Sequence, residues 1–182
     1  MNFMPSREES IELLQEVGLN QNIINHSIAV ADKALEIAKN LKNNGVTVDI
    51  TLVEIGALLH DIGRSKVHGW LHAIEGGNII REKGFSEKIA RIAETHILGG
   101  FSKKDCQILA LPVNRYLPET IEEKIVCYAD KLTKGTIYLT VEQRFDLWID
   151  EYGDTPILKN AKKRVKKIEK EIQKLLKFKK LK

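Results

Sequence analysis

Apolar residues recur at steps of three and four along most of this 182-residue chain, and no segment alternates as a half-buried strand would. Ser6-Arg-Glu-Glu9 and Thr120-Ile-Glu-Glu123 have the pattern of capping boxes, which satisfy free backbone N–H groups at a helix start. In one long segment, residues 20–42, the residues that share one face of the predicted helix are Ile23, His26, Val30, Ala34, Ile37 and Leu41. The spacing predicts an all-α fold, with an irregular stretch at 101–118.

Short connections between the helical segments favour one compact single-domain bundle. Hydrophobic residues make up 43% and charged residues 30%, and no stretch approaches the ~18–20 apolar residues of a membrane span. The first nine residues lack the apolar core of a secretory signal. Cys106 and Cys127 have no metal-ligand or redox spacing, so we expect reduced thiols in a cytoplasmic protein with no membrane partner.

The net charge of +4 is unevenly distributed. Residues 161–182 hold eleven Lys and Arg against two acids, whereas the rest of the chain holds 18 basic and 23 acidic residues. Residues 156–182 are predicted to form a basic amphipathic helix, separate from a domain at 1–155. Three interpretations stay open: the helix packs on the body, its apolar seam pairs with a second copy as a homodimer or with a partner, or its charge attracts nucleic acid or an acidic membrane.

The candidate chemistry centres on His60 and Asp61, which end an apolar run that begins at Ile55. An ionised Asp beside such a run is costly unless it is paired or bound to a metal ion. A divalent cation would satisfy it, and His26 and Asp130, each in a helical segment, are the natural further ligands. Gly63 would let the backbone turn away and leave room for the ion.

The ordered set His26, His60-Asp61 and Asp130 resembles the signature of the HD-domain superfamily of metal-dependent phosphohydrolases. The run from His60 to Gly63 matches its His-Asp-Ile-Gly subgroup literally, and the resemblance covers residues 20–135. It implies a helical bundle of the HD-domain type, with a catalytic domain at 1–155 followed by the basic helix.

The resemblance also implies a site for two ions, with Asp61 bridging them. One ion would be held by His26, His60, Asp61 and Asp130, and the other by His72 and His96. Only about ten residues separate Asp61 from His72, which is short for some dinuclear members, so one ion is the alternative and His68 is a competing ligand. Mixed imidazole and carboxylate ligands suit Fe, Mn, Co or Ni better than a closed zinc site.

The implied activity is hydrolysis of a phosphomonoester or phosphodiester, nucleotide-like, by a metal-activated water. Asp61, His72 and His96 are the candidate catalytic residues. The candidate contacts for a small phosphorylated substrate are Arg64, Lys66 and Lys131, with Lys134 and Arg144 further downstream. Trp70 and Trp148 are expected to be packing residues. Two alternatives stay open: a regulatory module that binds a nucleotide without turnover, and a di-iron oxygenase on the same fold.

Overall fold

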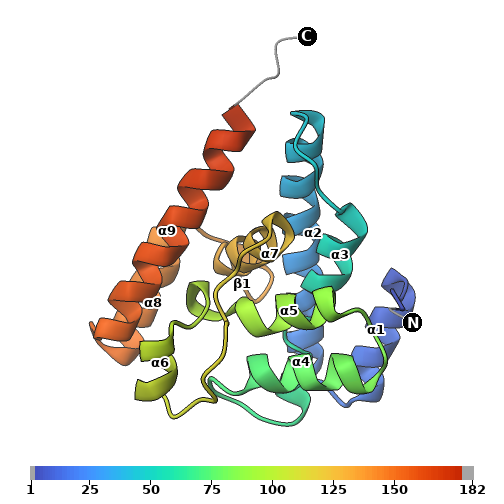
Figure 1. Cartoon of the computed structure of the whole chain (residues 1–182), viewed down its shortest axis with the longest axis horizontal. Helices are drawn as coiled ribbons and strands as arrows, with labels where there is room; N and C mark the ends of the chain where they lie inside the picture. Colours follow the sequence, from blue (N-terminus) through green and yellow to red (C-terminus); the bar gives the residue numbers. More distant parts are fainter. Residues whose placement is uncertain (1–2, 178–182) are drawn as a thin grey trace.

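The computed structural model describes residues 3–177, which fold almost entirely into helices (Figure 1). The α-helices of this part are α1 (Arg7–Glu16), α2 (Gln21–Asn43), α3 (Ile50–Leu59), α4 (His72–Glu82), α5 (Glu87–Thr95), α6 (Lys103–Ile108), α7 (Ile121–Lys131), α8 (Val141–Tyr152) and α9 (Pro156–Lys177). Two 3-10 helices, η1 (Ile62–Ser65) and η2 (Ile97–Gly99), and a hairpin of β1 (Thr133–Lys134) with β2 (Ile137–Tyr138) complete it. The all-α prediction is confirmed.

The structure departs from the sequence prediction at three short segments. The stretch at 101–118 was expected to be irregular with a possible turn or two of helix at 102–110, and it contains the short helix α6 there, which Ser102 and Asp105 begin with a capping box. The hairpin after α7 was not predicted, because two-residue strands are too short to show alternation. The capping box predicted at the start of α7 is half formed: the Thr120 hydroxyl accepts the Glu123 N–H, but the Glu123 carboxylate accepts the N–H of Glu119.

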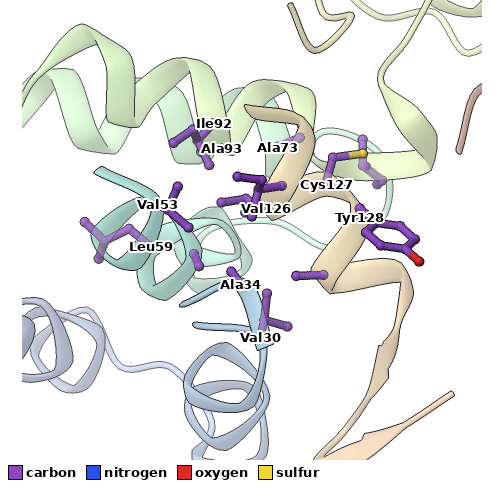
Figure 2. Close-up of a cluster of buried hydrophobic side chains, with 14 of the residues drawn as sticks. Val30, Ala34, Val53, Leu59, Ala73, Ile92, Ala93, Val126, Cys127 and Tyr128 are labelled. Atoms are coloured by element: carbon purple, nitrogen blue, oxygen red, sulfur yellow. The ribbon is translucent and has the colours of Figure 1, made fainter. Parts of the chain in front are cut away.

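The core lies between α2, α3, α5 and α7, where small and branched side chains allow close packing. Figure 2 shows Val126 of α7 in the middle of this cluster, with Ile92 and Ala93 of α5 on one side and Val30 and Ala34 of α2 on the other. All five side chains are at most 1% exposed. This packing fixes α2 and α7 against each other, and each of them carries one of the candidate ligands, His26 and Asp130.

The tight turn after α3 lies directly against the start of α4. A Cβ atom on Gly63 would lie 2.0 Å from the backbone oxygen of His72 and 2.5 Å from the backbone nitrogen of Gly76. Only glycine leaves room for this approach. The contact shortens the distance that the loop from Asp61 to His72 has to span, so that both ends of the loop reach the same site.

The last helix packs on the body of the molecule over its described length (Figure 1). Its seam is buried against α7, α8 and η2, and comprises Leu158, Ala161, Val165, Ile168 and Ile172. The predicted helix extends to residue 182, and its end from 178 lies outside the described residues. Within residues 3–177, none of the helices combines the length and the apolar character that a bilayer crossing requires.

Candidate metal centre

Six candidate ligands meet at one place, although they come from five helices. Their positions are His26 in α2, His60 and Asp61 directly after α3, His72 at the start of α4, His96 directly after α5 and Asp130 in α7. We call these six residues the ligand cluster. Five of them are at most 7% exposed, and His26 is partly buried at the rim. The structure therefore brings together the six residues that the two-ion hypothesis nominated as ligands.

The four histidine rings are held in the same way, through Nδ1. Each Nδ1 lies 2.5–3.0 Å from a backbone oxygen: His26 from Gly135, His60 from Ala57, His72 from Gly69 and His96 from Ala93. A carbonyl oxygen only accepts, so each Nδ1 carries a proton, and in the neutral ring Nε2 presents a lone pair. Metal-binding histidines are oriented by bonds of this kind. The four Nε2 atoms are thus prepared as ligand atoms.

The ligand atoms converge in two groups. One group comprises His26, His60 and Asp130, and the other His60, Asp61 and His96; within each group the ligand atoms lie within 4.8 Å of one another. The Nε2 atoms of His72 and His96 are 3.3 Å apart, and they lie 3.0 and 3.5 Å from the Asp61 Oδ1 atom. Lone pairs facing one another at these distances repel unless a proton or a cation lies between them.

Two atoms at the centre of the cluster are buried without a hydrogen-bond partner in the described part of the chain, His60 Nε2 and Asp61 Oδ1. Buried polar atoms are rarely left in this state. Both atoms are good ligands for a divalent cation, and both belong to the groups that converge. The residues present therefore fit a metal ion.

The protonation states of His60, Asp61, His96 and Asp130 agree with this interpretation. The pKa of His26 is raised, because burial, which acts to lower it, is outweighed by the carboxylate of Asp130. Burial lowers the pKa of His60 to about 3 and also lowers the pKa of His96, so both rings are neutral near pH 7. Burial acts to raise the pKa of Asp61, but the imidazole rings around its carboxylate, His60 first and then His72 and His96, hold that pKa well below its ordinary value. The pKa of Asp130 is lowered in the same way, by Lys131 and His26 acting against its burial. Neutral imidazoles and ionised carboxylates are the forms that bind metal.

Two of the three predicted phosphate contacts lie at the cluster, and both are engaged there. The Arg64 Nε atom is 2.8 Å from Asp61 Oδ2. The Lys131 ammonium is buried, contacts Asp130 and donates to the backbone oxygen of His96 at 3.0 Å. Lys66 points elsewhere: it lies 3.4 Å from Glu82 and is not part of the pocket lining. His68, the competing ligand, is exposed on the loop outside the cluster.

The cluster opens into a pocket of about 550 Å³. Its floor includes His26, Asp61, His72, His96 and Asp130, and facing them are Arg144, Trp148, Glu151 and Tyr152 of α8 with Leu158 of α9. We call these last five residues the α8–α9 wall. Trp70 completes the mouth with 38% exposure. The two tryptophans, Trp70 and Trp148, were expected to be packing residues, and both also line the pocket.

A model of the HD domain matches residues 23–135, which include the whole ligand cluster. The chain is 47% identical over 129 residues to the uncharacterized protein MJ0778 of Methanocaldococcus jannaschii, covering 71% of this chain and 76% of that protein. It is 40% identical over 146 residues to a tRNA (cytidine(56)-2'-O)-methyltransferase of Thermoplasma volcanium, covering 80% of this chain. The chain spans only 42% of the methyltransferase.

Among solved structures, the crystal structure of the HD domain of the L. monocytogenes phosphodiesterase PgpH is similar in fold. The TM-score is 0.51 at 18% sequence identity, and the match covers 88% of this chain and 98% of that one. The likeness supports the fold alone, while the family model matches the part of the chain that holds the ligand cluster. On the family match and the 47% identical relative, this chain belongs to the HD domain family.

Proposed function

We propose that this protein is a metal-dependent phosphohydrolase that cleaves a nucleotide-like phosphomonoester or phosphodiester. The observation that carries the proposal is the convergence of six ligating side chains on a pocket large enough for a small organic phosphate. The site offers neutral imidazoles and ionised carboxylates together, which suits Fe, Mn, Co or Ni.

The geometry favours two ions over one. The two oxygens of Asp61 face different histidines: Oδ1 lies near His72 and His96, and Oδ2 lies 3.7 Å from His60. A carboxylate with one oxygen toward each half of the cluster suits a bridging ligand. The first ion would then be held by His26, His60, Asp61 and Asp130, and the second by Asp61, His72 and His96.

When bound, such ions supply a water of lowered pKa and stabilise the negative charge of a phosphoryl group. The residues of the chain prepare the site for that chemistry. The Lys131 ammonium ties Asp130 to the backbone of His96, so that ligands from α7 and α5 keep a fixed distance. Arg64 holds Asp61 and also lines the pocket, where its remaining N–H groups are placed to donate to phosphate oxygens.

The likeness to a tRNA methyltransferase bears on the substrate and not on the reaction. The match covers 80% of this chain but only 42% of that protein. We therefore do not extend methyl transfer to this chain. The Thermoplasma volcanium relative is nevertheless named for an activity on tRNA. We therefore include RNA with terminal phosphates, and nucleotides released from RNA, among the substrates to assay.

The test is release of phosphate, or of a ring-opened phosphomonoester, from a panel of nucleoside monophosphates, cyclic nucleotides and short RNAs with terminal phosphates. Each is assayed without oxygen in the presence of Mn²⁺, Fe²⁺, Co²⁺ or Ni²⁺. Loss of an outer-shell partner alone costs about 10–100-fold, so we expect Asp61→Ala, which removes a ligand, to reduce turnover by about a hundredfold or more. His68→Ala, a histidine outside the cluster, is the matched control.

Full turnover by Asp61→Ala would refute the proposal. Tight nucleotide binding by the wild-type protein with no turnover under any of these metals would favour a regulatory module instead. In a parallel assay with O₂, turnover of a reduced substrate that requires O₂, without hydrolysis of any phosphate ester in the anaerobic assay, would favour a di-iron oxygenase.

A further inference from the structure

The pocket beside the ligand cluster has one wall that lies beyond the part of the chain matched by the family model. The ligand cluster falls between residues 26 and 130, inside the match at 23–135. The α8–α9 wall comes from residues 144–158, which follow it. The ligand cluster therefore lies within the part matched by the family model, whereas the α8–α9 wall comes from helices that follow that part.

Arg144 is the cation on this wall, and its guanidinium is free of carboxylates. Three cations line the pocket; Arg64 is paired with Asp61, and Lys131 is paired with Asp130. No carboxylate oxygen within residues 3–177 lies within 4.0 Å of an Arg144 nitrogen. The Nε atom is also buried without a hydrogen-bond partner in the described part of the chain. Arg144 is partly buried, so its guanidinium group, which has no carboxylate partner among these residues, is available to bind an anion in the pocket.

Trp148 holds this guanidinium in place. The Cζ atom of Arg144 lies 4.6 Å from the centre of the Trp148 ring, in the range of a cation–π contact. The ring is itself fixed edge-on against Phe145, at 5.0 Å between ring centres, and Phe145 is fully buried. Arg144 is thus oriented before any ligand arrives, which reduces the entropy lost on binding.

The Trp148 ring also relates the position of Arg144 to the ligand cluster, because Lys131 contacts the same ring. The Lys131 ammonium lies 5.8 Å from the ring centre and contacts Asp130, whereas Arg144 makes no contact with a member of the cluster. An anion bound by Arg144 would therefore lie in the same pocket as the ligand cluster but on its α8–α9 wall. The pocket volume of about 550 Å³ is sufficient for a ligand that reaches both places.

We propose that Arg144, supported by Trp148, forms a subsite for a second phosphate of the substrate, distinct from the phosphate that is cleaved at the ligand cluster. The preferred substrates are then phosphate esters with two phosphate groups, such as nucleoside bisphosphates or dinucleotides, over simple monophosphates. The proposal rests on the proposed phosphohydrolase function and specifies its substrate class. A planar guanidinium binds phosphate oxygens through two parallel hydrogen bonds, which a lysine does not reproduce.

The test compares adenosine 3',5'-bisphosphate with adenosine 5'-monophosphate, which share base and sugar and differ by one phosphate. KM and kcat are measured for the metal-loaded wild-type protein and for Arg144→Ala, Arg144→Lys and Trp148→Leu. Hydrogen bonds to a charged group predict a KM for the bisphosphate that rises about ten- to a hundredfold in Arg144→Ala, with a much smaller rise for the monophosphate. Arg144→Lys and Trp148→Leu should lie in between.

Arg115→Ala is the matched control, because Arg115 is 77% exposed and lies outside the pocket lining. Thermal melting of each variant shows whether it is folded. An unchanged KM for the bisphosphate in Arg144→Ala, or an equal rise for both nucleotides, would overturn the subsite.

The failure of the proposed function is a separate outcome. If the wild-type protein turns over neither nucleotide, the phosphohydrolase proposal fails for these substrates, and the same proteins are titrated with both nucleotides by calorimetry. The subsite then predicts that the bisphosphate binds at least about tenfold more tightly than the monophosphate, and that Arg144→Ala removes the difference. Equal affinities in the wild-type protein would contradict it.

Discussion

Three histidines of the ligand cluster are oriented by the same kind of local hydrogen bond. In His60, His72 and His96 the ring donates from Nδ1 to the backbone oxygen three residues earlier, at a point where a helix begins or ends. For His60 and His96 the acceptors, Ala57 and Ala93, are among the last carbonyl groups of α3 and α5, which have no partner within the helix, whereas for His72 the acceptor, Gly69, lies in the loop before α4. The end of the helix thus orients the ring, and Nε2 points away from the backbone into the cluster.

The order of these residues in the sequence was enough to nominate all six ligands. The same order could not show that Lys66 turns away to Glu82 or that Lys131 is buried between Asp130 and His96. A surface lysine and a buried one look alike when neighbouring residues are equally apolar. Their positions depend on how α4 and α7 pack, which is a property of the tertiary fold.

At Gly63 we predict a strict requirement for glycine. In Gly63→Ala the new Cβ atom would meet the His72 backbone, so η1 and α4 would separate and stability would fall by about 3 kcal/mol. The metal content should fall as well, because Asp61 and His72 would move apart. Chemical denaturation and elemental analysis measure the two effects.

Gly76→Ala is the control for this substitution. Its Cβ atom would make only ordinary contacts, 3.4 Å from the Ala93 Cβ atom, and alanine in a helix is favoured over glycine by about 0.5–1 kcal/mol. We expect near-native stability and metal content. Equal stability of the two variants would contradict the close approach of η1 and α4.

The two cysteines should be unreactive in the folded protein. Cys106 and Cys127 are both fully buried, and burial raises the pKa of Cys106 and raises the pKa of Cys127 to about 11. The thiolate forms only as the pH rises toward that value, so a disulfide reagent at pH 8 should label neither residue until the protein is unfolded, and then both. Rapid labelling of the native protein would show that the core opens readily.

At the scale of elements, the turn after α5 connects the ligand cluster to the last helix. Leu98 has a left-handed backbone, with φ of 52°, and Gly99 and Gly100 follow with positive φ. The Arg164 side chain of α9 donates to the backbone oxygen of Gly100 at 2.9 Å and pairs with Asp105 of α6. The basic helix therefore supports the segment that carries His96, in addition to contributing a wall of the pocket.

The burial of the α9 seam predicts that substitutions on the two faces of α9 change the stability of the protein by different amounts. Ile172 is fully buried, so Ile172→Ala should lower the free energy of unfolding by about 2–4 kcal/mol through lost contacts and a residual cavity. Lys170→Ala on the exposed face of the same helix should change it by less than about 0.5 kcal/mol. Urea denaturation measures both, and equal effects would show that α9 does not pack on the body in solution.

Helix positions were predictable from sequence because caps and apolar periodicity act locally. Asp49, Ser86 and Thr140 each begin a helix with a hydroxyl or carboxylate that accepts a backbone N–H, as local pattern alone can indicate. The α8–α9 wall was not predictable in the same way. Nothing in the spacing of Arg144 and Trp148 shows that α8 folds back over a site built by residues 26–130.

At the scale of the whole molecule, the ligand cluster connects helices from distant parts of the chain. It joins α2 to α7 through His26 and Asp130, whose side chains lie 3.1 Å apart across 104 residues. A cation bound there would link α2, α3 and α7 directly. Because the unfolded chain cannot reproduce this arrangement, metal binding should stabilise the fold.

Metal removal should accordingly lower the melting temperature. At a free metal concentration about a hundredfold above Kd, one ion contributes about 2.7 kcal/mol. For a chain of this length, that amount corresponds to about 5–10 °C between the metal-loaded and chelator-treated protein. In Asp61→Ala the shift should be largely absent, and a shift of the same size in that variant would place the stabilising metal elsewhere.

The most direct test of the account is the number of metal ions bound per chain, measured by elemental analysis of protein purified without oxygen. Wild type, Asp61→Ala, His96→Ala and the control His68→Ala are compared. The account predicts two ions in the wild type and in His68→Ala, one ion in His96→Ala and loss of both in Asp61→Ala. A metal content in His96→Ala and Asp61→Ala equal to that of the wild type would contradict the ligand cluster as the metal centre.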